Sequence, residues 1–298
     1  GLAERDNRIT GLEESMNQSL AERDNLIEGL EKPISYLKTS LVLQERRLSM
    51  LLEEARKRLP EPFNHDQLHT FANEELHLLD PLYVSFEDQF RGTREDIKDR
   101  LKVYLPLIKE AKAGNDKRPI LDIGCGRGEW LELLQEEGLQ AKGLDINAIL
   151  VEQCRERRMD VIEGDVIEYL CTLSAASLGA VTAFHLIEHL SFRLLMKFLD
   201  ETVRVLKPGG LAIFETPNPE NILVGACNFY LDPTHRNPLP PAMMKFLADS
   251  RGLCRVEIKH LHPYDEVLRI RDDGSDLAKR FNDFFYGPQD YAVLGYRI

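Results

Sequence analysis

Residues 121–128 read LDIGCGRG, an apolar run with one acidic residue that leads into three alternating glycines. Gly124, Gly126 and Gly128 allow the backbone to turn sharply and to come close to a ligand. An amphipathic stretch follows, so the order predicts a strand, a tight turn and a helix N-terminus, which is an arrangement suited to nucleotide-like ligands. The G-x-G-x-G spacing differs from the G-x-G-x-x-G of dinucleotide-binding proteins.

Two further acidic residues stand where the next two predicted strands end. Asp145 follows the glycines by about twenty residues, where a carboxylate can accept hydrogen bonds from both ribose hydroxyls. Asp165 ends the third strand, where a carboxylate can meet the exocyclic amine of an adenine while Ile146 and Val166 pack on the ring. Either acid alone can instead be a helix N-cap, but the glycines and both acids in this order favour a ligand site.

From residue 117 onward, short apolar runs alternate with amphipathic stretches, which predicts an α/β domain with a mostly parallel sheet covered on both faces. The last run follows a long connection and is expected to be an antiparallel insertion. The predicted strands lie near 119–123, 141–145, 160–164, 179–185, 210–216, 254–261 and 291–297, and the predicted helices near 128–137, 147–158, 193–205 and 240–250.

Residues 117–298 resemble the class I S-adenosylmethionine (SAM)-dependent methyltransferases. The resemblance rests on the glycine turn, Asp145, Gly164-Asp165, HLIEHL at 185–190 and LKPGG at 206–210. It implies a Rossmann-like sheet of seven strands with an antiparallel last strand, and SAM as the cofactor. Asp145 would hold the ribose and Asp165 the adenine. The residues expected at the cofactor are Arg91, Asp122, Gly124, Cys125, Gly126, Asp145, Ile146, Asp165, Val166 and His185.

The sulfonium of such a donor already activates the methyl group, so positioning an in-line attack supplies much of the rate. A hydroxyl acceptor also needs a base, whereas a phosphate or carboxylate does not. His185, Glu188 and His189 follow the fourth strand, at the edge where open α/β sheets bind ligands. His189 is a candidate for catalysis, with a histidine bonded to the backbone at a helix start as the alternative. Some quinone-precursor O-methyltransferases carry acidic and His metal ligands here, but His185 replaces the first expected acid, so no metal is assigned.

A proline-stiffened segment at 216–241 follows the fifth strand and carries Asp, His and Arg side chains. A loop of this length is typical of a functional segment, with structural turn chemistry as the alternative. His189, His235 and Asp232 are the predicted catalytic residues. The predicted substrate-binding residues are Asn218, Tyr230, His235 and Arg236.

The DPTH sequence at 232–235 is similar to methyltransferases of bacterial polysaccharide gene clusters, including those that terminate O-antigen chains. Their F-x-x-x-F-R-G pattern is matched by Phe86 to Phe90-Arg91-Gly92. This resemblance implies an O-methyltransferase acting on a terminal sugar hydroxyl or phosphate, with Arg91 reaching the cofactor carboxylate as part of a lid. A surface arginine is the alternative for Arg91. The alternative functions are a small-molecule or quinone-precursor O-methyltransferase, and a coiled-coil scaffold with an inactive cofactor-binding domain.

Residues 1–59 predict a coiled coil, because Ile27, Ile34, Leu41 and Leu48 are spaced by seven and flanked by charged residues. This seam predicts that the chain forms a homo-oligomer, or that the coil spaces the enzyme from a glycosyltransferase or another polysaccharide-assembly protein. The alternative is an amphipathic helix that packs on its own domain. Residues 60–116 are predicted to form a helical pre-domain or lid, broken at Pro81 and Gly92. Residues 117–298 are predicted to form the methyltransferase domain.

The net charge of −12 argues against nucleic acid as the main partner, since such binding depends on Lys and Arg neutralising phosphates. The five cysteines show no C-x-x-C pair and indicate reduced thiols. Neither a membrane-spanning run nor a signal peptide is expected. The predicted location is the cytoplasm, peripheral at the inner membrane through partners. Because the chain begins with Gly1 rather than Met, it is expected to be a piece of a longer protein.

Overall fold

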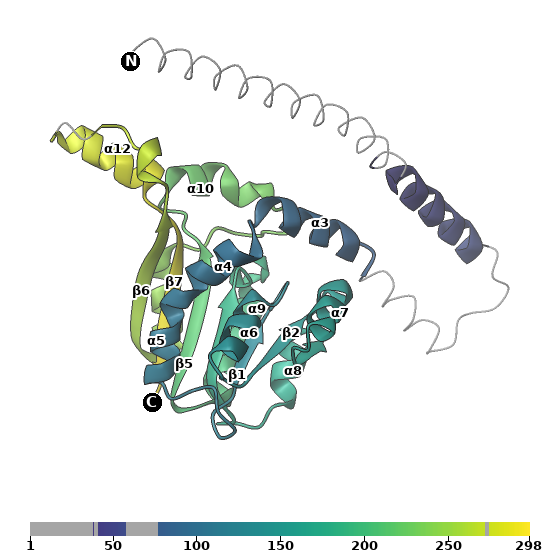
Figure 1. Cartoon of the computed structure of the whole chain (residues 1–298), viewed down its shortest axis with the longest axis horizontal. Helices are drawn as coiled ribbons and strands as arrows, with labels where there is room; N and C mark the ends of the chain where they lie inside the picture. Colours follow the sequence, from purple (N-terminus) through teal and green to yellow (C-terminus); the bar gives the residue numbers. More distant parts are fainter. Residues whose placement is uncertain (1–37, 39–40, 58–76, 272–273) are drawn as a thin grey trace, which may run out of the picture. The chain divides into compact units, whose positions relative to one another are not determined.

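The computed structural model describes residues 38, 41–57, 77–271 and 274–298 (Figure 1). The chain divides into two compact units, Gly1–Ala72 and Asn73–Ile298. In the first unit, residues 41–57 are helical and exposed. The rest of the predicted coiled coil, apart from residue 38, lies outside the described residues, so the coiled coil stays a prediction. Within the described ranges, no helix has the length and apolar character needed to cross a membrane.

The second unit contains a seven-stranded sheet with the order β3-β2-β1-β4-β5-β7-β6. Strand β7 runs antiparallel to both β5 and β6, and the pairs among β1 to β5 are parallel. This topology confirms the predicted α/β sheet with an antiparallel last strand. The strands are β1 (Ile120–Ile123), β2 (Ala141–Asp145), β3 (Val161–Glu163), β4 (Leu178–Phe184), β5 (Leu206–Pro217), β6 (Leu253–Pro263) and β7 (Pro288–Arg297).

Helices cover both faces of this sheet. The four predicted helices are confirmed as α6 (Glu129–Glu136), α7 (Ala148–Glu156), α9 (Phe192–Val205) and α11 (Pro241–Ser250). The sequence did not predict α8, α10 and α12, which are short or lie in long connections. The remaining helices are α3 (Asp80–Phe90), α4 (Arg94–Leu101), α5 (Leu105–Glu110), α8 (Val166–Thr172), α10 (Ile222–Ala226) and α12 (Asp276–Tyr286), with the 3-10 helices η1 (Lys102–Tyr104), η2 (Ile187–His189), η3 (Asn228–Leu231) and η4 (Glu266–Leu268).

The described part of the predicted pre-domain packs directly onto the sheet. Tyr104 and Ile108 are fully buried in one core with Trp130 and Phe184. The Tyr104 ring lies 5.3 Å from the ring of Phe184, centroid to centroid. Because these side chains share one core, the helices after residue 77 belong to the same compact unit as the sheet. The division between units falls after Ala72, and the predicted domain boundaries at 59/60 and 116/117 stay a prediction.

Helix α3 is delimited at both ends as the sequence predicts. Pro81 lies in its first turn, where the missing N–H costs nothing. Gly92, at φ +99°, breaks the chain before α4. The Asp80 carboxylate accepts a hydrogen bond from the Ala148 N–H at 3.0 Å, and the Asn147 side-chain amide donates to the Asp80 carbonyl at 3.3 Å. These bonds attach the start of α3 to the start of α7, beside the carboxyl end of β2.

Candidate active site

Two adjoining cavities lie at the carboxyl edge of the sheet. The glycine-turn cavity, of about 470 Å³, is lined by the turn after β1 and the ends of β2 and β3. The loop cavity, of about 350 Å³, is lined by α3, the ends of β4 and β5, and the loop around Asp232 and His235. Five residues line both cavities and therefore mark their junction: Tyr83, Glu87, Arg91, His185 and His189.

The backbone conformation of the turn after β1 requires glycine at three positions. Gly124, Gly126 and Gly128 have φ values of +68°, +51° and +81°, a conformation that side chains with a Cβ rarely adopt. A Cβ at Gly124 would lie 3.1 Å from the Leu186 side chain, and one at Gly128 would lie 2.7 Å from the Met159 sulfur. The bare backbone of this turn is thus free to approach a ligand in the cavity.

Asp145 lies at the predicted position, in the wall of the glycine-turn cavity. Its Oδ2 accepts the Gly126 N–H at 2.8 Å, and its Oδ1 accepts the Asn147 N–H at 2.9 Å. Burial raises the pKa of this carboxyl, although both backbone hydrogen bonds oppose the shift. The two bonds hold the carboxylate rigidly, and its remaining lone pairs suit two neighbouring ribose hydroxyls.

Asp165 is a helix N-cap and also lines the glycine-turn cavity, so its contact with an adenine stays a prediction. Its Oδ1 accepts the Ile167 and Glu168 N–H groups at 2.8 and 3.0 Å and caps α8. The same residue lines the glycine-turn cavity together with Ile146 and Val166. The cap uses only Oδ1, so an adenine amine in this cavity would find Oδ2 as its acceptor.

Two predicted cofactor residues have side chains outside both cavities. Asp122 is buried in β1, accepts the Thr182 hydroxyl at 2.7 Å, and has a pKa raised to about 7, chiefly by burial. Cys125 packs in a small core with Cys154 and Met159. Strand alternation and the turn direct both side chains into the protein interior, and their predicted binding of the cofactor stays a prediction. Any contact that Cys125 makes with a ligand comes from its backbone.

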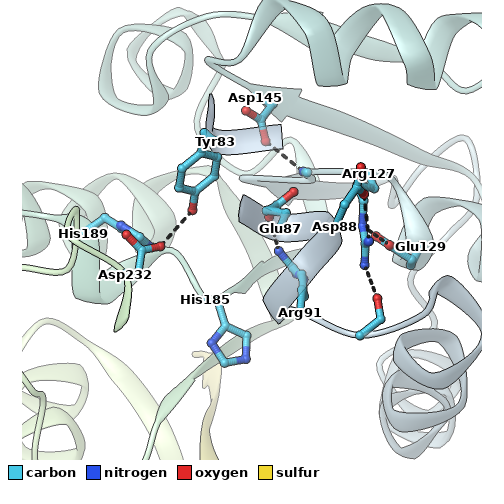
Figure 2. Close-up of polar contacts among 12 residues, drawn as sticks. Tyr83, Glu87, Asp88, Arg91, Arg127, Glu129, Asp145, His185, His189 and Asp232 are labelled. Carbon is cyan, nitrogen blue, oxygen red and sulfur yellow. Dashed lines mark hydrogen bonds and ion pairs between the residues drawn. The ribbon is translucent and has the colours of Figure 1, made fainter. Parts of the chain in front are cut away.

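Arg91 lies over the glycine turn. Its Nη1 donates to the Glu87 Oε1 at 2.7 Å, and both groups lie 3.5 Å from the position of a Cβ on Gly126 (Figure 2). This places the guanidinium where the sequence predicts it. Its binding to a cofactor carboxylate stays a prediction, since in the structure Glu87 holds one of its nitrogens.

A hydrogen-bonded chain links His189 to the loop that follows β5. The Thr234 hydroxyl donates to Oδ1 of Asp232 at 2.6 Å, and His189 Nδ1 lies 2.9 Å from the same hydroxyl oxygen. An ionised carboxylate only accepts hydrogen bonds, so the single Thr234 proton points to Asp232 and the His189 Nδ1–H must donate to Thr234. Neutral His189 therefore carries its lone pair on Nε2. Tyr83 donates to the other Asp232 oxygen at 3.4 Å (Figure 2).

His235 lies deeper in the loop cavity. Its Nδ1 is 2.6 Å from the Phe229 carbonyl oxygen, which can only accept, so Nδ1 carries a proton. Its Nε2 lies 3.9 Å from oxygens of both Glu188 and Asp232. The His235 and His189 rings meet edge to face with centroids 4.7 Å apart. The structure thus brings together all three predicted catalytic residues, His189, His235 and Asp232.

His185 lies at the junction with an uncommon backbone conformation, φ +54°. Its Nδ1 is 3.3 Å from Glu188, and its Nε2 is 3.5 Å from Glu215 and 3.8 Å from Asp290. Burial opposes the charged form, but hydrogen bonds to Glu188 and Glu215 and the charge of Asp290 outweigh it and raise the pKa of His185 to about 10. The Tyr104 hydroxyl also donates to Glu215. At neutral pH His185 is therefore an imidazolium held between carboxylates.

Two groups of side chains approach the spacing of metal ligands. One is Glu188, His189 and His235, and the other is His185, Glu215 and Asp290, each with ligand-type atoms within 4.8 Å of one another. The hydrogen bonds and ion pairs described above account for these separations, and we assign no metal to either group.

The predicted substrate-binding residues are distributed unevenly. His235 lines the loop cavity, whereas Arg236 lines the glycine-turn cavity and donates to the His189 carbonyl at 2.9 Å. Asn218 is buried, lines neither cavity, and joins the end of β5 to Pro288, so its binding of a substrate stays a prediction without support from the cavity lining. Tyr230 is exposed beside the loop cavity without lining it, because its neighbour Phe229 occupies the inward position.

The sequence did not single out Tyr83, Glu215 and Asp290 as site residues. The available signals were the acidic residue at the end of the fifth strand and the acid at the start of the antiparallel strand. In the structure Asp290 pairs with Pro217, which brings the beginning of β7 to the carboxyl edge of β5.

Comparison with known proteins identifies the family of this chain. A family described as a methyltransferase domain matches residues 91–257, more than half of the chain. The chain belongs to this methyltransferase family. A solved SAM-dependent methyltransferase from Archaeoglobus fulgidus is 34% identical, with a TM-score of 0.66 over 72% of this chain and 99% of that one.

Curated relatives support the same assignment over a shorter range. This methyltransferase is 33% identical to a probable SAM-dependent methyltransferase of Mycolicibacterium smegmatis over 51% of its length and 57% of the relative. It is 26% identical to a ubiquinone biosynthesis O-methyltransferase of Alkalilimnicola ehrlichii over 43% of its length and 53% of the relative. The matches thus span little more than half of these two relatives. The methyl donor is SAM, and the glycine-turn cavity has the residues to hold it, which leaves the inactive scaffold without support.

Proposed function

We propose that this methyltransferase transfers a methyl group from SAM to a terminal sugar hydroxyl or phosphate of a bacterial surface polysaccharide. The observation that carries the proposal is the meeting of two separate sequence patterns at one cavity. Phe86, Phe90 and Arg91 from the F-x-x-x-F-R-G segment line the loop cavity together with Asp232 and His235 from the DPTH segment.

The lining of the loop cavity suits a sugar. The Phe86 and Phe90 rings lie 4.8 Å apart by their centroids and offer an apolar surface for the C–H face of a pyranose. Asp232 and His235 offer acceptors and donors for its hydroxyls. A cavity with apolar walls and a few fixed polar groups is the usual form of a small-ligand site.

The partners and the location belong to the same proposal. Residues 41–57 form an exposed helix within the predicted coiled coil, and this segment would join copies of the chain or space the enzyme from a glycosyltransferase or another polysaccharide-assembly protein. Such an enzyme would act in the cytoplasm, at the inner membrane through its partners. Nucleic acid is not expected as a partner because the net charge is −12.

Incubation with SAM labelled in its methyl group and a panel of mannose- and rhamnose-terminated oligosaccharides, with and without a terminal phosphate, tests this function. We expect label on at least one oligosaccharide and none on the same oligosaccharide with its terminal residue removed. Absence of label on the whole panel, for enzyme that binds SAM in calorimetry, would refute the glycan acceptor.

A second candidate is a small-molecule O-methyltransferase that acts on a quinone precursor. The name of the Alkalilimnicola ehrlichii relative favours it. The carboxylates and histidines of the loop cavity disfavour it, because an apolar prenylated acceptor would leave these buried polar groups without partners. Label transfer to a catechol-type quinone precursor, but to no oligosaccharide, would support this candidate instead.

A further inference from the structure

His189 lies at the junction of the two cavities, where, under the proposed function, a methyl group would pass from the donor side to the acceptor side. Its Nδ1–H donates to Thr234, which in turn donates to Asp232. The side chain therefore has one fixed tautomer, with the lone pair on Nε2. A fixed imidazole lone pair at the point of transfer is what a general base requires.

Burial favours the neutral form of His189. It is faced by Glu188 from η2, by Asp232 and His235 from the loop, and by His185 from the end of β4. Burial lowers the pKa of His189, and its two histidine neighbours also lower it, while the two carboxylates oppose the shift. At neutral pH the imidazole is thus ready to accept a proton.

The loop cavity carries an excess of negative charge. Four carboxylates line it, Glu87, Glu215, Asp232 and Asp290, against three cations, Arg91, Arg100 and the imidazolium of His185. Arg91 is already paired with Glu87, and the imidazolium of His185 is held by carboxylates. Arg100 is exposed. In the described chain it is thus the one guanidinium of this lining that has no carboxylate bound to it and that an anionic acceptor would find free. A phosphate or carboxylate substrate would enter against like charge.

We infer that the acceptor group is an uncharged alcohol, that His189 accepts its proton, and that Thr234 and Asp232 are positioning residues for His189. The inference rests on the proposed function and decides between its two acceptor atoms, since a phosphate oxygen needs no base. The alcohol oxygen forms a bond to the methyl carbon of SAM while the carbon–sulfur bond breaks and its electron pair stays on sulfur. The hydroxyl proton passes to Nε2 of His189, leaving a methyl ether and neutral S-adenosylhomocysteine.

The first test compares two acceptors: one mannose- or rhamnose-terminated oligosaccharide, and the same molecule with a phosphate on its terminal sugar. We expect kcat/KM to be about a hundredfold higher for the uncharged molecule because of like-charge repulsion in the cavity. Faster transfer to the phosphate oxygen overturns the inference and leaves the glycan function standing. No transfer to either molecule, by enzyme that binds SAM, overturns both.

The second test separates His189 and its positioning residues from a structural role. His189→Gln should lower kcat by about 10²–10⁴-fold, with the dissociation constant for SAM unchanged and the acid limb of the pH–kcat profile lost. Thr234→Val should lower kcat about tenfold without raising KM, because the imidazole tautomer is no longer fixed, and Thr234→Ser should restore it. Wild-type turnover in His189→Gln, or equal losses in both Thr234 variants, contradicts the assignment.

Discussion

At the scale of single residues, Asp145 is the position where sequence and structure agree most closely. The predicted end of β2 locates it, and the Gly126 N–H fixes its carboxylate. Asp145→Asn should weaken SAM binding by about ten- to a hundredfold, because a charge-assisted acceptor for the ribose hydroxyls is lost. Calorimetric titration with SAM measures this change. Glu168→Gln, which removes an exposed carboxylate from α8, is the matched control. Equal affinities in the two variants would remove Asp145 from the donor site.

His185 gives the protein a predictable dependence on pH. Its pKa is about 10 in the folded state against 6.5 ordinarily, so the folded state holds the proton more tightly than the unfolded chain. The stabilisation from this charge is complete below pH 6.5 and is lost as the pH rises through about 10. Urea unfolding at pH 6.5 and 9.5 should show a falling midpoint for the wild type and a smaller fall for His185→Gln. Parallel falls in both proteins would contradict the charged state of His185.

The structure positions several residues in ways that the sequence does not show, each for its own physical reason. Asp122 stands inside β1, where side chains point to the faces of the sheet rather than to its edge. Asn218 lies in the predicted functional loop, but its side chain donates to the Pro288 carbonyl and accepts the Glu220 N–H. Glu215 and Asp290 meet only through the antiparallel pairing of β5 with β7, a long-range register that no local pattern encodes. Acids at strand ends were predictable, and partners across strands were not.

At the scale of elements, the sheet and its main helices follow from the alternation of apolar runs, whereas the placement of α3 does not. The sequence predicts the bounds of α3 through Pro81 and Gly92. Its position depends on tertiary contacts: the bond of Asp80 to the start of α7, and that of Arg127 to the Gly92 carbonyl at 3.0 Å (Figure 2). These contacts hold α3, and the Arg91 that follows it, in place beside the glycine turn.

The ion pair between Glu87 in α3 and Arg91, just after α3, leads to a testable prediction about SAM binding. Arg91→Ala should weaken SAM binding about tenfold or more, because it removes a cation over the turn and leaves the Glu87 charge buried and unpaired. Calorimetry on Arg91→Ala and on Arg91→Ala/Glu87→Gln separates these causes. Persistence of the loss in the double variant assigns the effect to Arg91 itself, and recovery assigns it to Glu87. Lys102→Ala, which removes an exposed cation from η1, is the control. Wild-type affinity in Arg91→Ala would remove its predicted role.

At the scale of the whole molecule, the catalytic unit and the N-terminal unit are separate compact bodies. The sequence predicts the fold of the catalytic unit well, since apolar strands, glycine turns and acids at strand ends are local signals. It does not show that Tyr104 and Ile108 are buried against the sheet, because this packing depends on side chains far away in sequence.

The exposed leucines of residues 41–57 lead to a prediction about assembly. Leu41 and Leu48 are each 58% exposed and belong to the seven-residue stripe, whereas Leu43 is 59% exposed and lies off it. If the stripe is a coiled-coil seam, the wild-type chain should sediment as a dimer or trimer at micromolar concentration. Leu41→Lys/Leu48→Lys places charges in the seam and should give monomers, while Leu43→Lys should sediment like the wild type. A monomeric wild type would refute the seam. If Leu43→Lys also gave monomers, assembly would depend on apolar contact in general. Only a coiled-coil seam distinguishes positions seven residues apart from their neighbours.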